Sequence, residues 1–99
     1  MFNFYTQVTN LDERVTDRVL YDILSQVGRV VDLHIPRDRE TDKPKGFAFA
    51  EYETKEIADY AVKLLSGLVT LYNRTLRFGV SYLFSLDLLR QDNILNKMI

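Results

Sequence analysis

Two phenylalanines, Phe47 and Phe49, lie two residues apart in a short apolar run that follows Lys45. In a strand they share one face, and the alternate residues of 48–52 supply the other. Aromatic rings on an uncovered sheet stack on nucleobases, at about 1–3 kcal/mol per base, and a neighbouring cation neutralises phosphate. The alternative is that both rings belong to the core, but the alternate residues already fill a core face. The spacing therefore predicts a surface that binds unpaired nucleotides.

Such a surface needs a sheet with one open face, which the apolar periodicity predicts. Strands are expected at 2–8, 30–35, 46–52 and 75–80, helices at 17–27 and about 55–66, and a charged loop at 37–45. Thr16 and Thr54 are expected N-caps, and Gly28 and Gly67 left-handed C-caps. The order βαββαβ predicts an α+β, ferredoxin-like sandwich, a four-stranded antiparallel sheet with two helices on one face. An extra helix beginning near residue 85 is a further option.

The length and composition of the chain exclude several classes of site and function. With 99 residues we expect one domain at 1–81 and a tail at 82–99. The sequence has no cysteine, which excludes disulfides and thiolate metal sites. It also carries no phosphate-binding loop or hydrolase motif, so we expect no enzyme, no cofactor and no metal site. No apolar run has the length of a membrane span. Thirteen basic against fourteen acidic side chains argue against bulk electrostatic attraction of polyanions, but they do not exclude a local basic surface.

The octamer Lys45–Tyr52 resembles the K/R-G-F/Y-G/A-F-V-x-F/Y motif of the RNA-recognition motif family, with Ala50 in place of valine. The resemblance covers about residues 4–81. Stretches 10–15, 20–24, 35–41 and 58–61 resemble in particular the first such domain of the splicing factor 3b subunit 4 proteins and their plant relatives. This resemblance implies a nuclear protein of pre-mRNA splicing or RNA surveillance. The implied partners are single-stranded RNA and protein subunits of a splicing complex. The chain is expected to be monomeric when alone.

The first strand departs from the family pattern. Gln7 occupies the position where the family has an aromatic side chain, and Thr6 stands where an aliphatic one is usual. Gln7 can hydrogen-bond a base but stacks less area, so we expect weak RNA binding. Tyr5 shares the parity of Gln7 and is an alternative stacking ring. A further interpretation is that residues 1–7 and the chain after Val80 derive from altered exons.

Several polar side chains are secondary candidates for RNA contact. Arg37, Arg39 and Lys43 lie in the charged loop, where the family clamps RNA, and Arg77 points outward on the last strand. The alternative is a solvated loop whose acidic residues cancel most of its charge. His34 should face the open sheet, where it either contacts a base or is simply an exposed polar residue.

The helical side offers a second binding surface. Tyr21, with Leu20 and Leu24, lies along the first helix, and Tyr60 flanks the apolar stripe of the second. Exposed apolar rings mark partner sites, although both rings could equally rim the core. The alternative function is therefore a protein-interaction scaffold with little RNA binding. In the tail, Phe84 to Met98 are expected to fold across the sheet and cover its aromatic face.

Overall fold

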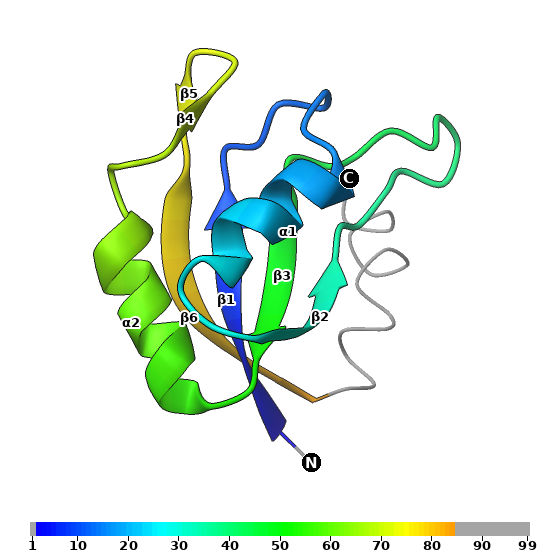
Figure 1. The fold of residues 1–99 in the computed structure, drawn as a ribbon. Coiled ribbons are helices and arrows are strands. Elements are labelled where there is room, and N and C mark those ends of the chain that lie inside the picture. Colours follow the sequence, from blue (N-terminus) through cyan, green and yellow to red (C-terminus); the bar gives the residue numbers. More distant parts are fainter. Residues whose placement is uncertain (1, 85–99) are drawn as a thin grey trace.

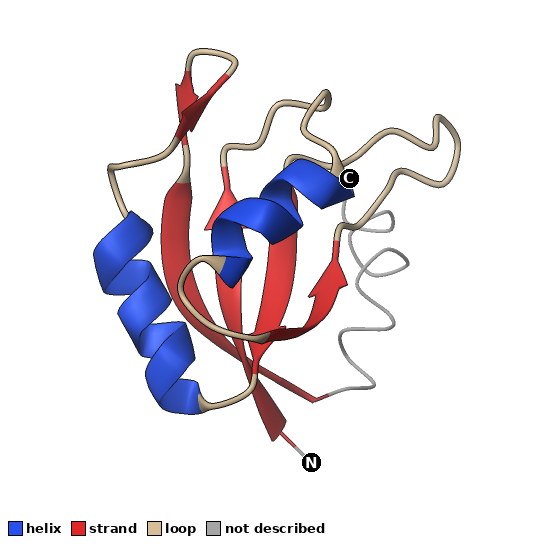
Figure 2. Cartoon of the chain, viewed as in Figure 1, coloured by secondary structure: helices blue, strands red, loops and turns tan. Residues whose placement is uncertain are grey.

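Four antiparallel strands form the main sheet of the computed structural model, which describes the backbone of residues 2–84 and the side chains of 4–81 (Figure 1). The elements are β1 (Phe2–Thr9), α1 (Asp17–Ser25), β2 (Val30–His34), β3 (Phe47–Tyr52), α2 (Lys55–Leu65), β4 (Thr70–Leu71), β5 (Arg74–Thr75) and β6 (Arg77–Phe84). The strand order is β2-β3-β1-β6, and a small hairpin of β4 and β5 precedes the last strand. Both helices lie on one face of the sheet (Figure 2). The predicted ferredoxin-like sandwich is confirmed.

One core fills the space between the sheet and the helices. It contains Leu20 and Leu24 from α1, Ala58 and Ala61 from α2, and the alternate strand residues beneath them. The hydroxyl of Tyr52 donates a 2.6 Å hydrogen bond to the Leu24 carbonyl, which fixes α1 on β3. Burial of the ring raises the pKa of Tyr52 to about 12, because the phenolate form would lose its hydration.

The predicted helix starts are confirmed, but one predicted stop is wrong. Thr16 and Thr54 each accept a hydrogen bond from the third residue of their helix. Gly67 has a φ of 77° after α2, the predicted left-handed conformation. Gly28, by contrast, is not among the residues with positive φ. Glycine at this position lets the Ile57 side chain of α2 lie close to the backbone, since a Cβ built there would lie 2.6 Å from Cγ2 of Ile57.

The last part of the domain also differs from the prediction. The turn between β4 and β5 is formed by Tyr72 and Asn73, both with positive φ. The final strand continues to Phe84 instead of ending at Val80, because it pairs with β1 along its whole length. The predicted helix from about residue 85, and the predicted passage of the tail across the sheet, lie outside the described residues. Among the helices of residues 2–84, none has the length and apolar character to cross a membrane.

Strand β2 forms one edge of the sheet and is irregular. Its register against β3 shifts between Val30 and Asp32, which leaves a bulge at Val31. Val31 is 54% exposed. The bulge lies before His34, so the regular pairing of His34 with β3 is kept.

Candidate nucleic-acid interface

Strand pairing arranges the side chains of the open face in three rows. The first row holds Phe47, Thr9 and Arg77; the middle row His34, Phe49, Gln7 and Gly79; the third row Asp32, Glu51, Tyr5 and Ser81. Val8 and Ala48 alternate with these positions and belong to the core under the helices. Because successive residues of a strand face opposite sides, the rows lie on the side away from both helices. Phe47 and Phe49 therefore share the open face, as their parity predicted.

Three aromatic rings form a cluster of their own on this face. Phe49 contacts Phe47 edge to face at 5.7 Å and Tyr5 at 6.4 Å between ring centroids. The cluster is separate from the helix-side core. Phe49 is only 4% exposed and Tyr5 2%, whereas Phe47 is half-buried. A base has direct access to Phe47, and stacking on Phe49 requires its ring to become accessible.

The middle row shows how β1 differs from the expected pattern. Gln7 is half-buried between Phe49 on β3 and Gly79 on β6. Tyr5 lies one row away and packs against Phe49, so it does not replace the ring missing at Gln7. Thr6 faces the helices with no exposed area, and its hydroxyl donates a 3.2 Å hydrogen bond to the Ala58 carbonyl. That bond satisfies a polar group where an aliphatic side chain was expected.

His34 lies beside Phe49 on the open face, as its alternation predicted. Its Nε2 atom is shielded from solvent and has no hydrogen-bond partner among the described residues. Buried polar atoms are normally paired. A base could reach this nitrogen only if the atoms that shield it moved aside.

The loop cations are partly engaged within the protein. Arg37 donates to the Asp42 carbonyl at 3.0 Å, and its guanidinium lies 3.9 Å from Asp17. Lys43 lies 3.9 Å from Glu13. Such long, exposed ion pairs contribute little to the stability of the fold.

Three further cations differ in their surroundings. Arg39, in the loop, and Arg77, in the first row, are exposed and make no ion pair within residues 4–81. Lys45 is half-buried at the entrance to β3, where its backbone N–H donates to the Pro36 carbonyl. The residues of the loop thus border the first row. Arg77 lies within that row, on the open face itself.

A charged cluster that the sequence interpretation missed connects the β1–α1 loop to the hairpin. Arg14 donates two hydrogen bonds to the carboxylate of Asp12, at 2.9 and 3.1 Å, and Arg74 lies 4.0 Å away. The Arg14 guanidinium also covers the ring of Tyr72 at 4.3 Å. The hydrogen bonds from the Arg14 side chain and backbone, with the charges of both arginines, lower the pKa of Asp12 to about 2. The spacing Asp12-x-Arg14 was the available signal.

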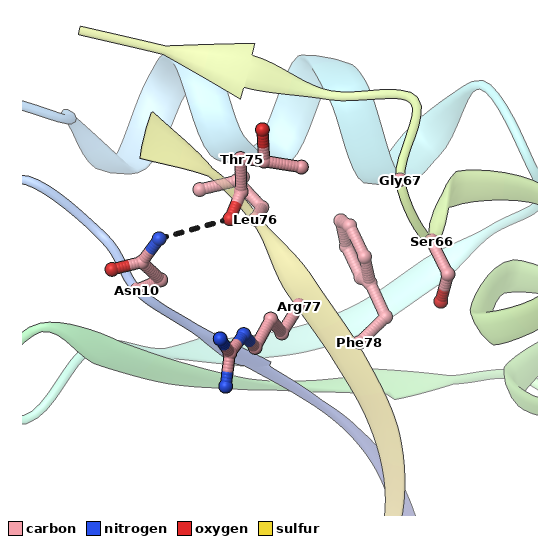
Figure 3. A pocket seen from close by; sticks show the side chains of 7 residues that line it. All are labelled: Asn10, Ser66, Gly67, Thr75, Leu76, Arg77 and Phe78. Atoms are coloured by element: carbon pink, nitrogen blue, oxygen red, sulfur yellow. Dashed lines mark hydrogen bonds between the residues drawn. The ribbon is translucent and has the colours of Figure 1, made fainter. Parts of the chain in front are cut away.

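Behind β6 lies a shallow hollow beside the end of α2 (Figure 3). Asn10 closes one side by donating a 3.0 Å hydrogen bond to the Thr75 carbonyl. Phe78 and Arg77 leave the strand in different directions in this view. Phe78 packs against the helix-side core, so Arg77 is left to the open face.

The helical side contains two exposed tyrosines and a correction. Tyr21 is 45% and Tyr60 56% exposed, as a partner surface requires. Leu20 and Leu24 have no exposed area because they point at the sheet, so their expected role in a partner surface is wrong. Tyr21 borders a groove between α1 and β2 with Leu33 as its apolar floor. Within residues 2–84, no group of three His, Asp or Glu side chains is placed to hold a metal ion.

Known proteins with similar sequences include splicing factors and cleavage stimulation factor subunits. Over 70 residues the chain is 39% identical to human splicing factor 3B subunit 4, covering 71% of this chain and 16% of that protein. Over 62 residues it is 45% identical to the serine/arginine-rich splicing factor SC35 of Arabidopsis thaliana, covering 63% of this chain and 20% of that one. The chain thus spans no more than a fifth of either relative's length.

Solved structures show the same arrangement. The Rna15 RNA recognition motif with bound RNA superposes with a TM-score of 0.67 at 31% identity, covering 76% of this chain and 79% of that one. A Sex-lethal protein–RNA complex gives 0.71 at 32% identity, covering 83% and 47%. The family model described as RNA recognition motif matches residues 7–77. With the strand order, the aromatic rows and these matches in agreement, the chain belongs to the RNA recognition motif family.

Proposed function

We propose that this chain binds single-stranded RNA on the open face of its sheet and acts in pre-mRNA splicing in the nucleus. The aromatic cluster on the face away from the helices carries the proposal. Known relatives named as splicing factors and solved relatives holding RNA support it. The chain acts by binding, without catalysing a reaction, and is monomeric when alone.

The proposed mechanism combines stacking with phosphate contacts. One base stacks on Phe47, and a second on Phe49 once that ring becomes accessible, at about 1–3 kcal/mol each. Arg77 contacts a phosphate beside them, since it is exposed and unpaired within the described side chains. Lys45 and the loop cations attract the RNA backbone and guide it along the first row. Without an aromatic ring at Gln7, RNA affinity is weak, so assembly with splicing proteins supports binding.

The test compares Phe47→Ala and Phe49→Ala with Tyr60→Ala, which removes an exposed ring on the helical side. A short pyrimidine-rich RNA is titrated and followed by fluorescence anisotropy. Each platform variant should weaken binding about 5- to 150-fold, the equivalent of 1–3 kcal/mol, whereas Tyr60→Ala should not. Thermal unfolding checks that each variant is folded. Full affinity in both folded platform variants would overturn the proposal.

A second candidate function is protein binding by the helical side. The exposed rings of Tyr21 and Tyr60 favour it, because apolar rings in water mark contact surfaces. Amide shifts separate the two functions when the chain is titrated with RNA and then with a splicing-complex subunit. If RNA leaves the amides around Phe47 and Phe49 unmoved while the protein shifts those around Tyr21, the scaffold function replaces RNA binding.

A further inference from the structure

A gap in the open face lies over Gly79, the third residue of β6. A Cβ built on this residue would meet no atom within 4 Å. Gly79 pairs with Gln7 of β1 and stands at the end of the middle row. Glycine within a strand weakens the strand, and it often marks a place where a ligand approaches the backbone. Here the bare backbone forms a floor at the edge strand of the sheet.

Three polar side chains surround this floor. Arg77 and Ser81 precede and follow Gly79 by two residues, so all three share a face, with about 7 Å between successive Cα atoms. Gln7 stands across the strand pair at about 5 Å. Side chains rise from a sheet roughly perpendicular to it. The amide, the guanidinium and the hydroxyl therefore stand around a hollow whose base is peptide backbone.

We propose that the hollow over Gly79 is a nucleotide subsite in which a base lies flat on the backbone and presents its edge to the Gln7 amide. The inference rests on the proposed RNA binding and deepens it. An aromatic side chain at position 7 would offer a ring to stack upon. Gln7 instead offers an N–H donor beside a C=O acceptor, and such a pair matches base edges that carry an acceptor beside a donor.

The remaining walls suit the other parts of a nucleotide. The Arg77 guanidinium is exposed and has no ion pair among the described side chains, so it can bind the phosphate on the side of the first row. The Ser81 hydroxyl can donate to or accept from the ribose on the other side. The base is thus selected by hydrogen bonds at its edge, whereas the bases on Phe47 and Phe49 are held by stacking, which every base can provide.

Filling the hollow tests the subsite without damaging the fold. Gly79→Ala and Gly79→Val place one and three carbons on the floor, where the structure has free space and no left-handed φ. Both should leave stability unchanged or higher, because alanine narrows the unfolded ensemble and valine suits a strand. RNA affinity should fall in the order wild type, alanine, valine, with at least a tenfold loss for valine. Unchanged affinity in a folded Gly79→Val variant overturns the proposal.

Gln7→Leu tests the reading of the base edge. It keeps a side chain of similar length and removes the amide. A panel of short RNAs that differ in one nucleotide measures the ratio of the strongest to the weakest Kd. We expect this ratio to fall at least threefold in Gln7→Leu, and an unchanged ratio contradicts edge reading.

Phe47→Ala, measured beside these variants, distinguishes failure of the Gly79 subsite from failure of RNA binding as a whole. If Phe47→Ala weakens binding while Gly79→Val and Gln7→Leu behave as wild type, RNA binding stands and the subsite fails. If Phe47→Ala and Phe49→Ala have no effect, the proposed function itself fails.

Discussion

Replacing Gly28 by alanine should destabilise the domain through a single contact. The new methyl group would lie 2.6 Å from Cγ2 and 3.3 Å from Cδ1 of Ile57, well inside the 3.5–4.0 Å of an ordinary carbon contact. Cγ2 is bonded directly to Cβ, so it moves only if χ1 rotates or the first turn of α2 shifts. In a helix isoleucine strongly prefers one χ1 rotamer.

The size of the effect follows from two opposing contributions. Overpacking of this kind costs about 1–3 kcal/mol, and the smaller freedom of alanine in the unfolded chain returns about 0.4–1 kcal/mol. We therefore expect a net loss of about 1–2 kcal/mol, a fall in Tm of roughly 4–16 °C for a domain of this size.

Urea unfolding of a double-mutant cycle measures the contact. In an Ile57→Ala background both clashing atoms are absent, so Gly28→Ala should become neutral or stabilising. Gly79→Ala is the matched control, because its methyl group meets nothing within 4 Å, and it should raise stability by about 0.4–1 kcal/mol. A Gly28→Ala protein as stable as wild type, with Ile57 present, would refute the reasoning.

Three further predictions concern ionisation and the tail. Since the folded-state pKa of Asp12 is lowered to about 2, its contribution to stability is present above pH 4 and is lost as the pH falls through 2. The difference in urea midpoint between wild type and Asp12→Asn should therefore shrink between pH 5 and pH 2, and a gap independent of pH would contradict this. The raised pKa of Tyr52, about 12, means that its contribution is complete below pH 10 and is lost as the pH rises through 12. An absorbance titration should lose a component near pH 12 in Tyr52→Phe; loss of one near pH 10 instead would show an exposed phenol. The sequence also predicts that the tail crosses the sheet, so a chain truncated at Tyr82 should bind RNA more tightly, and equal affinity would dismiss that prediction.

Local signals explain which parts of the fold were predictable. The caps at Thr16 and Thr54 and the left-handed Gly67 depend on neighbouring residues, so the sequence alone indicates them. Gly28 looked like another cap, but its role depends on Ile57, which approaches from the next helix. The length of β6 was likewise underestimated, because it is set by pairing with β1 rather than by its own residues.

In the candidate site, too, features set by neighbouring residues were predicted and features set by distant contacts were not. Parity along β3 placed Phe47 and Phe49 on one face, and the alternation of β2 placed His34 beside them. The contacts of Phe49 with Tyr5 and Phe47 were not predicted, because parity places rings on one face but does not show how they pack against one another. The partner surface was assigned too broadly, because helical spacing alone did not separate exposed Tyr21 from buried Leu20.

The bulge at Val31 also affects how copies of the domain behave when crowded. A regular edge strand is a template on which another chain can extend the sheet, and this route leads to aggregation. At β2 the bulge interrupts the run of evenly spaced backbone groups and twists the strand locally. A strand from another copy would find only an interrupted ladder along this edge. The β2 edge is therefore a poor template for the growth of a fibre.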